Sequence, residues 1–191
     1  SMLSAADIMA VLYSGVLNVD PQQPRKEDRD RFILSKGHAG AVVYATLAEK
    51  GFFPREWLDT YYQDDGKLMG HISHYVPGVE FSTGSLGHGL SLGLGLALQQ
   101  KRSGLGAQTY VILGDGENNE GSIWEAAMMA ANMAPGMNRS FLAEDWKHIV
   151  PRKCWYQAVE EAQPSEAMRD LPQMKDEMRR PMMLMVRAGK K

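Results

Sequence analysis

The fold of this chain is decided by Tyr110-Val-Ile-Leu-Gly-Asp-Gly-Glu-Asn-Asn-Glu-Gly-Ser-Ile-Trp-Glu-Ala-Ala127. An apolar run ends in Gly114-Asp115-Gly116, and a further glycine, Gly121, precedes a helix-like segment. This order is typical of a buried strand that leads into a turn and a helix at the edge of an α/β sheet. Backbone N–H groups at such an edge can bind a phosphate, and Asp115 can hold a divalent cation that neutralises it. The stretch therefore predicts a site for a metal-bound diphosphate.

Size and composition limit the remaining classes of function. The 191 residues, 44% of them hydrophobic, suffice for one domain with its own core. A net charge of −2, from 21 basic and 23 acidic residues, favours neither nucleic acid nor a membrane surface as a partner. No apolar stretch approaches the roughly 18 residues of a membrane span, and no signal peptide is visible. Cys154 is the single cysteine, which excludes an internal disulfide, so we expect a cytoplasmic protein.

Four blocks of sequence, in order, resemble the conserved blocks of the transketolase family. They are Arg29-Asp-Arg-Phe-Ile-Leu-Ser-Lys-Gly-His38, then Met69-Gly-His71 with Pro77-Gly-Val-Glu80, then Ser82-Thr-Gly-Ser-Leu-Gly-His-Gly89, and last Gly114-Asp115-Gly116-Glu117 with Glu120-Gly121. His88 stands where many full-length transketolases carry Gln. This form is more similar to the split transketolases, whose diphosphate-binding half is a separate polypeptide. The resemblance implies an α/β fold with a mostly parallel sheet flanked by helices, the diphosphate half of a thiamine-diphosphate enzyme.

The resemblance also implies roles for individual residues. Asp115 would bind Mg²⁺ or Ca²⁺, and the residues implied near the aminopyrimidine and diphosphate of the cofactor are Gly84, Ser85, Leu86, Gly114, Gly116 and Glu117. His38, His71 and His88 would surround the thiazolium and the substrate, where a neutral imidazole can both donate and accept. Simpler interpretations stay open at this point. Asp115 can cap a helix, the glycines can form an ordinary turn, the histidines can be structural, and Leu86 can belong to the core.

The elements follow from periodicity and punctuation. We predict helices over residues 5–16, 41–50, 121–133, 155–163 and 165–179, strands over 31–35, 110–113 and 182–186, and an irregular region over 64–89. Gly51 should close the second helix, and Pro54 should begin another. Residues 90–98 alternate leucine with small residues, which is typical of a strand, but the resemblance implies a helix packed closely through its glycines. We predict a helix there.

The resemblance ends after Met133. The family continues with a strand and then Asp-x-Asn about thirty residues after the motif aspartate, and that asparagine binds the metal. Here no run of four β-forming residues precedes Asp145, and Asn138 follows Asp115 by only 23 residues, so we expect no strand that ends at Asn138. Either the protein lacks these parts, or the sequence joins segments of a longer chain. We expect the second: one diphosphate-binding domain over 1–191, with further segments before residue 1 and within about 133–180.

The predicted reaction moves a two-carbon ketol unit between sugar phosphates with thiamine diphosphate. In the family a glutamate on a second, pyrimidine-binding domain helps to form the reactive cofactor, and 191 residues leave no room for that domain. A complementary C-terminal subunit is therefore expected, in a homodimer or heterotetramer. Two alternatives stay open: the alpha-type subunit of a 2-oxo acid dehydrogenase or a deoxyxylulose phosphate synthase, and a non-catalytic paralogue. A Rossmann domain is disfavoured because the motif lacks G-x-G-x-x-G.

Overall fold

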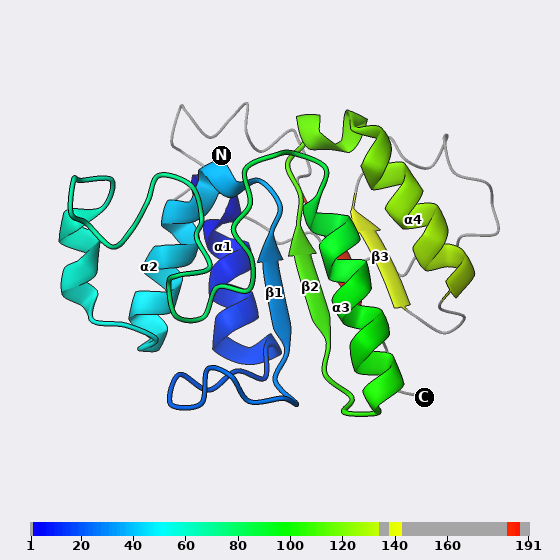
Figure 1. Ribbon diagram of the computed structural model, residues 1–191, viewed down its shortest axis with the longest axis horizontal. Helices are drawn as coiled ribbons and strands as arrows, with labels where there is room; N and C mark the ends of the chain where they lie inside the picture. Colours follow the sequence, from blue (N-terminus) through cyan, green and yellow to red (C-terminus); the bar gives the residue numbers. More distant parts are fainter. Residues whose placement is uncertain (1, 134–137, 143–182, 188–191) are drawn as a thin grey trace.

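The computed structural model describes residues 2–133, 138–142 and 183–187. Its centre is a parallel pair of strands, β1 (Arg31–Leu34) and β2 (Thr109–Ile112). Their register pairs Phe32 with Tyr110 and Ile33 with Val111. The ladder continues past β1, because the Ser35 N–H donates to the carbonyl of Ile112 over 2.8 Å. Both strands therefore end at the same edge of the sheet, the upper edge in Figure 1.

Helices and turns make up most of the remaining described chain. They are α1 (Leu3–Val11), the π-helical η1 (Leu12–Val16), η2 (Gly37–Ala39), α2 (Gly40–Lys50), η3 (Arg55–Thr60), α3 (Gly89–Ser103), η4 (Gly116–Asn119) and α4 (Gly121–Met133). The helices lie on both faces of the β1–β2 pair, with α1 and α2 on one side and α3 and α4 on the other (Figure 1). This is the flanked parallel arrangement that the sequence predicts.

The strands are buried on both faces because their side chains alternate between two apolar clusters. Phe32 and Leu34 of β1 pack with residues of α1 and α2, whereas Ile33 packs with residues of α3 and α4. Each such side chain contributes about 1.5–3 kcal/mol when it is fully buried. A continuous apolar run that is covered on both faces is the expected pattern of a parallel strand.

The helix predicted over 90–98 is confirmed as α3. The alternation of leucine with small residues, which is typical of a strand, is explained in part by a glycine that the packing requires. A methyl group added at Gly93 would lie 2.4 Å from Cγ2 of Val111, so only glycine lets the helix approach β2 this closely. Gly95 has no neighbour within 4 Å of such a methyl group. The close packing predicted through the glycines therefore holds at Gly93 and not at Gly95.

The predicted boundaries of other elements are largely confirmed. α2 ends at Gly51, whose φ of +91° places it in the left-handed region typical of a helix cap. Pro54 precedes η3 instead of beginning it, with ψ 136°, and η3 is a 3₁₀ helix. No helix or strand lies between η3 and Gly89, so the region predicted to be irregular is irregular.

The expectation for the chain after Met133 is wrong in one respect. Residues Asn138–Leu142 form a strand, β3, which pairs antiparallel with β4 (Met183–Arg187). The short run of Asn138-Arg-Ser-Phe-Leu142 seemed too poor in β-forming residues, but pairing with the apolar β4 compensates for weak intrinsic preference. Asn138 begins β3 and does not follow it. The predicted helices over 155–163 and 165–179 lie outside the described residues, as do the positions of the expected further segments.

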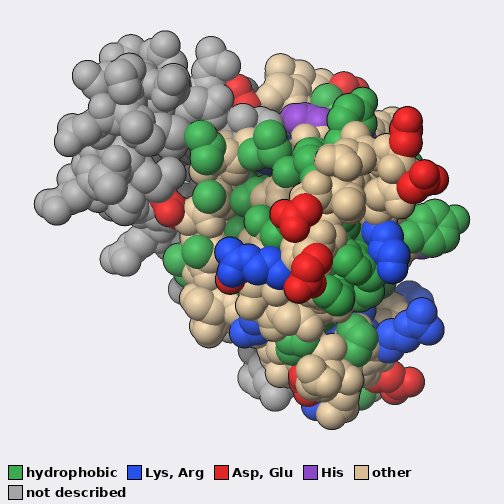
Figure 2. Space-filling view, turned by 90° about the vertical axis from the view of Figure 1, so that its left-hand side faces the viewer, with side chains coloured by type: hydrophobic (Ala, Val, Ile, Leu, Met, Phe, Trp, Pro, Cys, Tyr) green, Lys and Arg blue, Asp and Glu red, His purple; other side chains and the backbone are tan. Residues whose placement is uncertain are grey.

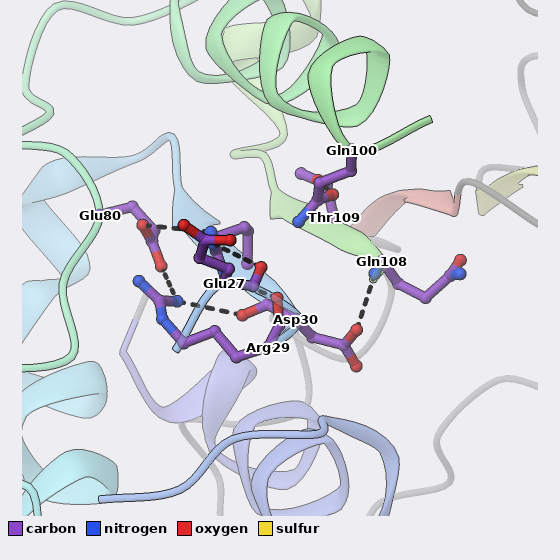
Figure 3. Close-up of polar contacts among 8 residues, drawn as sticks. Glu27, Arg29, Asp30, Glu80, Gln100, Gln108 and Thr109 are labelled. Atoms are coloured by element: carbon purple, nitrogen blue, oxygen red, sulfur yellow. Dashed lines mark hydrogen bonds and ion pairs between the residues drawn. The ribbon is translucent and has the colours of Figure 1, made fainter. Parts of the chain in front are cut away.

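A polar cluster lies at the amino ends of β1 and β2, opposite the motif edge (Figure 3). Asp30 is 6% exposed, and its carboxylate accepts the N–H of Asn18 over 2.9 Å and that of Gln108 over 2.7 Å. Beside it, Arg29 forms an ion pair with Glu80. We call these five residues the Asp30 cluster. It fastens the start of β1 to the start of β2 and to the loop after α1.

Candidate functional site

The carboxyl edge of the sheet is organised around one buried carboxylate. Glu117 of η4 is 1% exposed. Its Oε1 accepts the Ser35 hydroxyl and the Gly87 N–H (2.8 Å), and its Oε2 accepts the Gly114 N–H (2.8 Å). The Ser35 hydroxyl oxygen in turn accepts the N–H of Gly89 over 3.0 Å. We call these five residues the Glu117 cluster, and they join three of the four motif blocks.

The block with Ser35 also contacts the loop before α3 directly. A methyl group added at Gly37 would lie 1.9 Å from the carbonyl oxygen of Thr83, so this approach requires glycine. The Thr83 hydroxyl donates to the carbonyl of Leu34, and the Ile72 N–H donates to the carbonyl of Gly37 over 3.0 Å. The predicted second and third blocks are thus fastened to the turn that carries His38.

The Gly87 peptide is held on both sides. Its N–H donates to Glu117, and its carbonyl accepts the hydroxyl of Ser122 over 2.9 Å. Its φ is +83°, and an added methyl group would lie 2.4 Å from Oγ of Ser122. Glycine is therefore required here by backbone conformation and by space. Gly87 thereby fastens this loop to the start of α4.

The structure brings together His71 and Gly84, which come from two different motif blocks. A methyl group at Gly84 would lie 3.2 Å from Cδ2 of His71, so the two are in contact. Tyr44 holds this loop through its backbone: its hydroxyl donates to the His71 carbonyl over 2.9 Å. Burial raises the pKa of Tyr44 to about 12, so the phenol stays protonated and keeps donating near neutral pH.

The pKa of His38 depends on the charged residues around it, which include His71. Partial desolvation of the ring lowers the pKa of His38, and the charges of Lys36 and His71 lower it further, while Glu117 opposes the shift. The lowered pKa favours the neutral imidazole, which can donate at one nitrogen and accept at the other. His38 and His71 are both exposed to solvent, so both rings are accessible to a ligand.

Most of the remaining predicted site residues are exposed at the same edge. Ser85, Leu86, His88, Asp115 and Gly116 are exposed, whereas Gly114 and Glu117 are buried. The ring of His88 lies 3.0 Å through Nδ1 from the Leu86 carbonyl, at the position that precedes α3. The exposed Leu86 is not a core residue, which removes one of its two interpretations.

Asp115 occupies the N-cap position of η4 and makes no capping hydrogen bond through its side chain. Its simpler interpretation as a helix-capping residue is therefore not supported. The helix that follows the turn directly is the four-residue η4, and α4 begins only at Gly121. An added methyl group at Gly116 would meet nothing within 4 Å, so the backbone of the turn is open to a ligand.

The side chain of Glu117 has a role that the sequence did not predict. The resemblance implies that its backbone lies near the diphosphate, and the structure shows that its side chain is directed inward and satisfied by three protein donors. Neither this inward direction nor the contacts of Ser35 and Tyr44 were predicted from the sequence. A signal was present: Ser35 ends the apolar run of the first block, and Glu117 directly follows Asp115-Gly116. Only the tertiary structure shows that the two side chains meet.

The described residues show neither a cluster of metal-binding side chains nor a membrane-spanning helix. Among residues 2–133 and the short described strands, no group of three or more His, Cys, Asp or Glu side chains could hold a metal ion. In the same part of the chain, no helix is long and apolar enough to cross a membrane. On the face shown in Figure 2, acidic and basic side chains are interspersed, and a histidine lies near the upper edge, at the end where β1 and β2 finish.

Comparisons with known proteins identify the family of this chain. The family described as "Transketolase, thiamine diphosphate binding domain" matches residues 1–142. The chain belongs to the transketolase family. It corresponds to the thiamine-diphosphate-binding domain at the N-terminal end of that family's proteins.

Named transketolases show the extent of the likeness. One of the apulose-4-phosphate transketolase subunits of Actinobacillus succinogenes is 50% identical over 130 residues, which are 68% of this chain and 47% of that protein. The human transketolase is 41% identical over 132 residues, 69% of this chain and 21% of that protein. The solved transketolase of Leishmania mexicana superposes with a TM-score of 0.62 at 36% identity, covering 66% of this chain and 21% of that one. The chain thus matches about half the length of the split relatives.

Proposed function

We propose that this chain is the diphosphate-binding subunit of a split transketolase-like enzyme, which transfers a two-carbon ketol unit between sugar phosphates. One observation carries the proposal. Three motif blocks meet at the buried Glu117 carboxylate and leave Asp115, Gly116 and the site histidines exposed at the carboxyl edge of the sheet. In open α/β sheets, ligands bind at this edge.

The exposed turn after β2 suits thiamine diphosphate, and Asp115 would supply one ligand of a divalent cation. Asp115 would hold Mg²⁺ or Ca²⁺, because its carboxylate is exposed at the turn that follows β2 and oxygen ligands suit these ions. The open backbone at Gly116 and the exposed Ser85 and Gly84 would contact the cofactor. The bound cofactor would supply a carbanion and an electron sink. The protein itself would bind and orient the cofactor and would position the sugar next to it.

The histidines would act on the sugar. His38 and His71 lie at the same edge, and the lowered pKa of His38 keeps its ring neutral near pH 7. A neutral ring can accept a proton from a sugar hydroxyl and donate one to a carbonyl oxygen. His88 would face the same substrate from the start of α3.

The partner and the substrate follow from the relatives' names. Relatives are named as subunits of an apulose-4-phosphate transketolase and of a 6-deoxy-6-sulfo-D-fructose transketolase. For this chain we propose a complementary subunit that supplies the pyrimidine-binding half, in a dimer or heterotetramer in the cytoplasm. The substrate would be a ketose with an anionic group at its far end, such as a sugar phosphate.

The test uses the full-length protein with its complementary subunit. Calorimetric titration with thiamine diphosphate and Mg²⁺ should release heat and raise the melting temperature, since a ligand that binds only the folded state stabilises it. Turnover should then occur with xylulose 5-phosphate or apulose 4-phosphate and an aldose acceptor. Turnover of pyruvate alone would favour the 2-oxo acid or deoxyxylulose phosphate alternative. Absence of cofactor binding would favour a non-catalytic paralogue.

A further inference from the structure

We infer that Glu117 is a positioning residue, which sets the placement of the cofactor turn relative to the two loops that carry His38 and His88. The inference rests on the proposed function, because it concerns the same site. It goes beyond that function because it assigns the affinity for the cofactor partly to a side chain that touches neither cofactor nor substrate.

The Glu117 carboxylate is buried and is bound by protein donors. It is 1% exposed and accepts three hydrogen bonds from protein groups. An ionised carboxylate is stable in such a place only when it is fully hydrogen-bonded. A glutamine here would point its NH₂ group at one of these N–H or O–H donors. Glu117→Gln therefore disturbs the donors without changing the size of the side chain.

Each donor lies within three residues of a residue that would touch the ligand. Gly114 directly precedes Asp115, and Gly87 directly precedes His88. Ser35 lies three residues before His38, at the turn that follows β1. A shift of the carboxylate would move all three loops relative to one another. Misplacement of binding groups by about 1 Å is enough to cost much of their effect.

The Asp30 cluster provides the matched comparison. Asp30 is also a buried carboxylate that accepts backbone N–H groups, from Asn18 and Gln108, at the opposite end of the same strands. None of these donors adjoins a predicted site residue. If Glu117 were only a structural fastener, the same carboxylate-to-amide change at Asp30 would have the same consequences for the cofactor.

The experiment compares Glu117→Gln with Asp30→Asn in the full-length protein with its complementary subunit. Melting temperature is measured without cofactor, and thiamine diphosphate affinity is measured by calorimetry at saturating Mg²⁺, well below both melting temperatures. We expect both variants to melt earlier. Only Glu117→Gln should weaken cofactor binding, by about tenfold or more, while Asp30→Asn stays within about twofold of wild type.

A second pair of variants, with smaller changes, tests the inference if Glu117→Gln does not fold. Ser35→Ala removes the hydroxyl from the Glu117 cluster, and Thr109→Val removes the buried hydroxyl that donates to Gln100 over 2.7 Å at the amino end of β2 (Figure 3). We expect Ser35→Ala to weaken cofactor binding by about threefold or more and Thr109→Val to leave it unchanged.

The outcomes are distinguishable. A wild-type protein that binds no thiamine diphosphate overturns the proposed function and this inference with it. Wild-type binding together with unchanged affinity in Glu117→Gln or Ser35→Ala overturns the inference alone. Equal losses of affinity in the variants at both ends of the sheet would also overturn it, because general destabilisation would then explain them.

Discussion

Asp30 and Glu117 fasten opposite ends of the same two strands by the same chemistry. At the amino end, Asp30 accepts N–H groups from Asn18 and Gln108. At the carboxyl end, Glu117 accepts hydrogen bonds from three loops that carry the motif residues. The chemistry alone does not distinguish a structural fastener from a site organiser. The difference lies in the neighbouring residues: the loops at the carboxyl end carry the exposed Asp115, His38 and His88.

The largest expected effect is a loss of cofactor affinity at Asp115, which lies at the carboxyl end only. Asp115→Ala should weaken thiamine diphosphate binding at saturating Mg²⁺ by about 100-fold or more, because the carboxylate would bind the metal. The loss of affinity should be much larger than any change in melting temperature without cofactor, because Asp115 is exposed and the loss of an exposed side chain destabilises a fold only modestly. Calorimetry measures the first quantity and a thermal melt the second. Asp59→Ala, at an exposed aspartate of η3, is the control. Equal affinities in the two variants would remove Asp115 from the site.

A second prediction tests the close packing around Gly87 at the carboxyl end of the sheet. Gly87→Ala should lower the free energy of unfolding by about 2–4 kcal/mol, because φ is +83° and the new methyl group would lie 2.4 Å from Oγ of Ser122. Gly51→Ala shares the positive φ, at +91°, but has open space, so it should cost only about 1–2 kcal/mol. Urea denaturation measures both. A Gly51 variant as unstable as the Gly87 variant would contradict the packing argument.

A third prediction concerns the middle of the sheet, between the two clusters. Gly93→Ala should destabilise the protein by about 1–3 kcal/mol, since the methyl group would collide with Val111. Gly95→Ala, two residues away on α3 and open, should be neutral or stabilise by up to about 1 kcal/mol through helix propensity. Neither should alter cofactor affinity at a temperature where both stay folded. Chemical denaturation with a cofactor titration checks both statements.

The smallest expected effect is the pH response of His38. Its pKa is lowered in the folded protein, chiefly by burial and then by Lys36 and His71, so the unfolded state binds more protons in the interval just below pH 6.5. Stability should therefore be fully present above pH 6.5 and decline as the pH falls toward the lowered pKa. Below it, no further loss from His38 is expected.

The measurement compares wild type with His38→Gln. Between pH 7.5 and about 5, wild type should lose more unfolding free energy than the variant, which lacks this titration. An NMR titration of the His38 ring should give a midpoint below that of an exposed histidine, about 6.5. A midpoint at or above that value would mean that the neighbouring Glu117 charge outweighs burial and Lys36.

Much of the fold was predictable from local patterns. The apolar runs at β1 and β2, the glycine that closes α2 and the span of α4 all follow from periodicity and punctuation. The strand β3 was not, because its pairing with β4 depends on a segment about forty residues later in the sequence. α3 needed the family resemblance, since its glycines imitate the period of a strand.

The motif residues and their chemical types were determined by the sequence alone. It placed Asp115, the glycines and the three histidines in blocks, and these blocks identify the family. The tertiary structure alone decided that Glu117 turns inward and that Ser35, Gly87 and Gly114 converge on it. The physical reason is that a carboxylate can be buried only where enough donors meet. Here the donors come from positions 35, 87 and 114, which only the folded chain brings together.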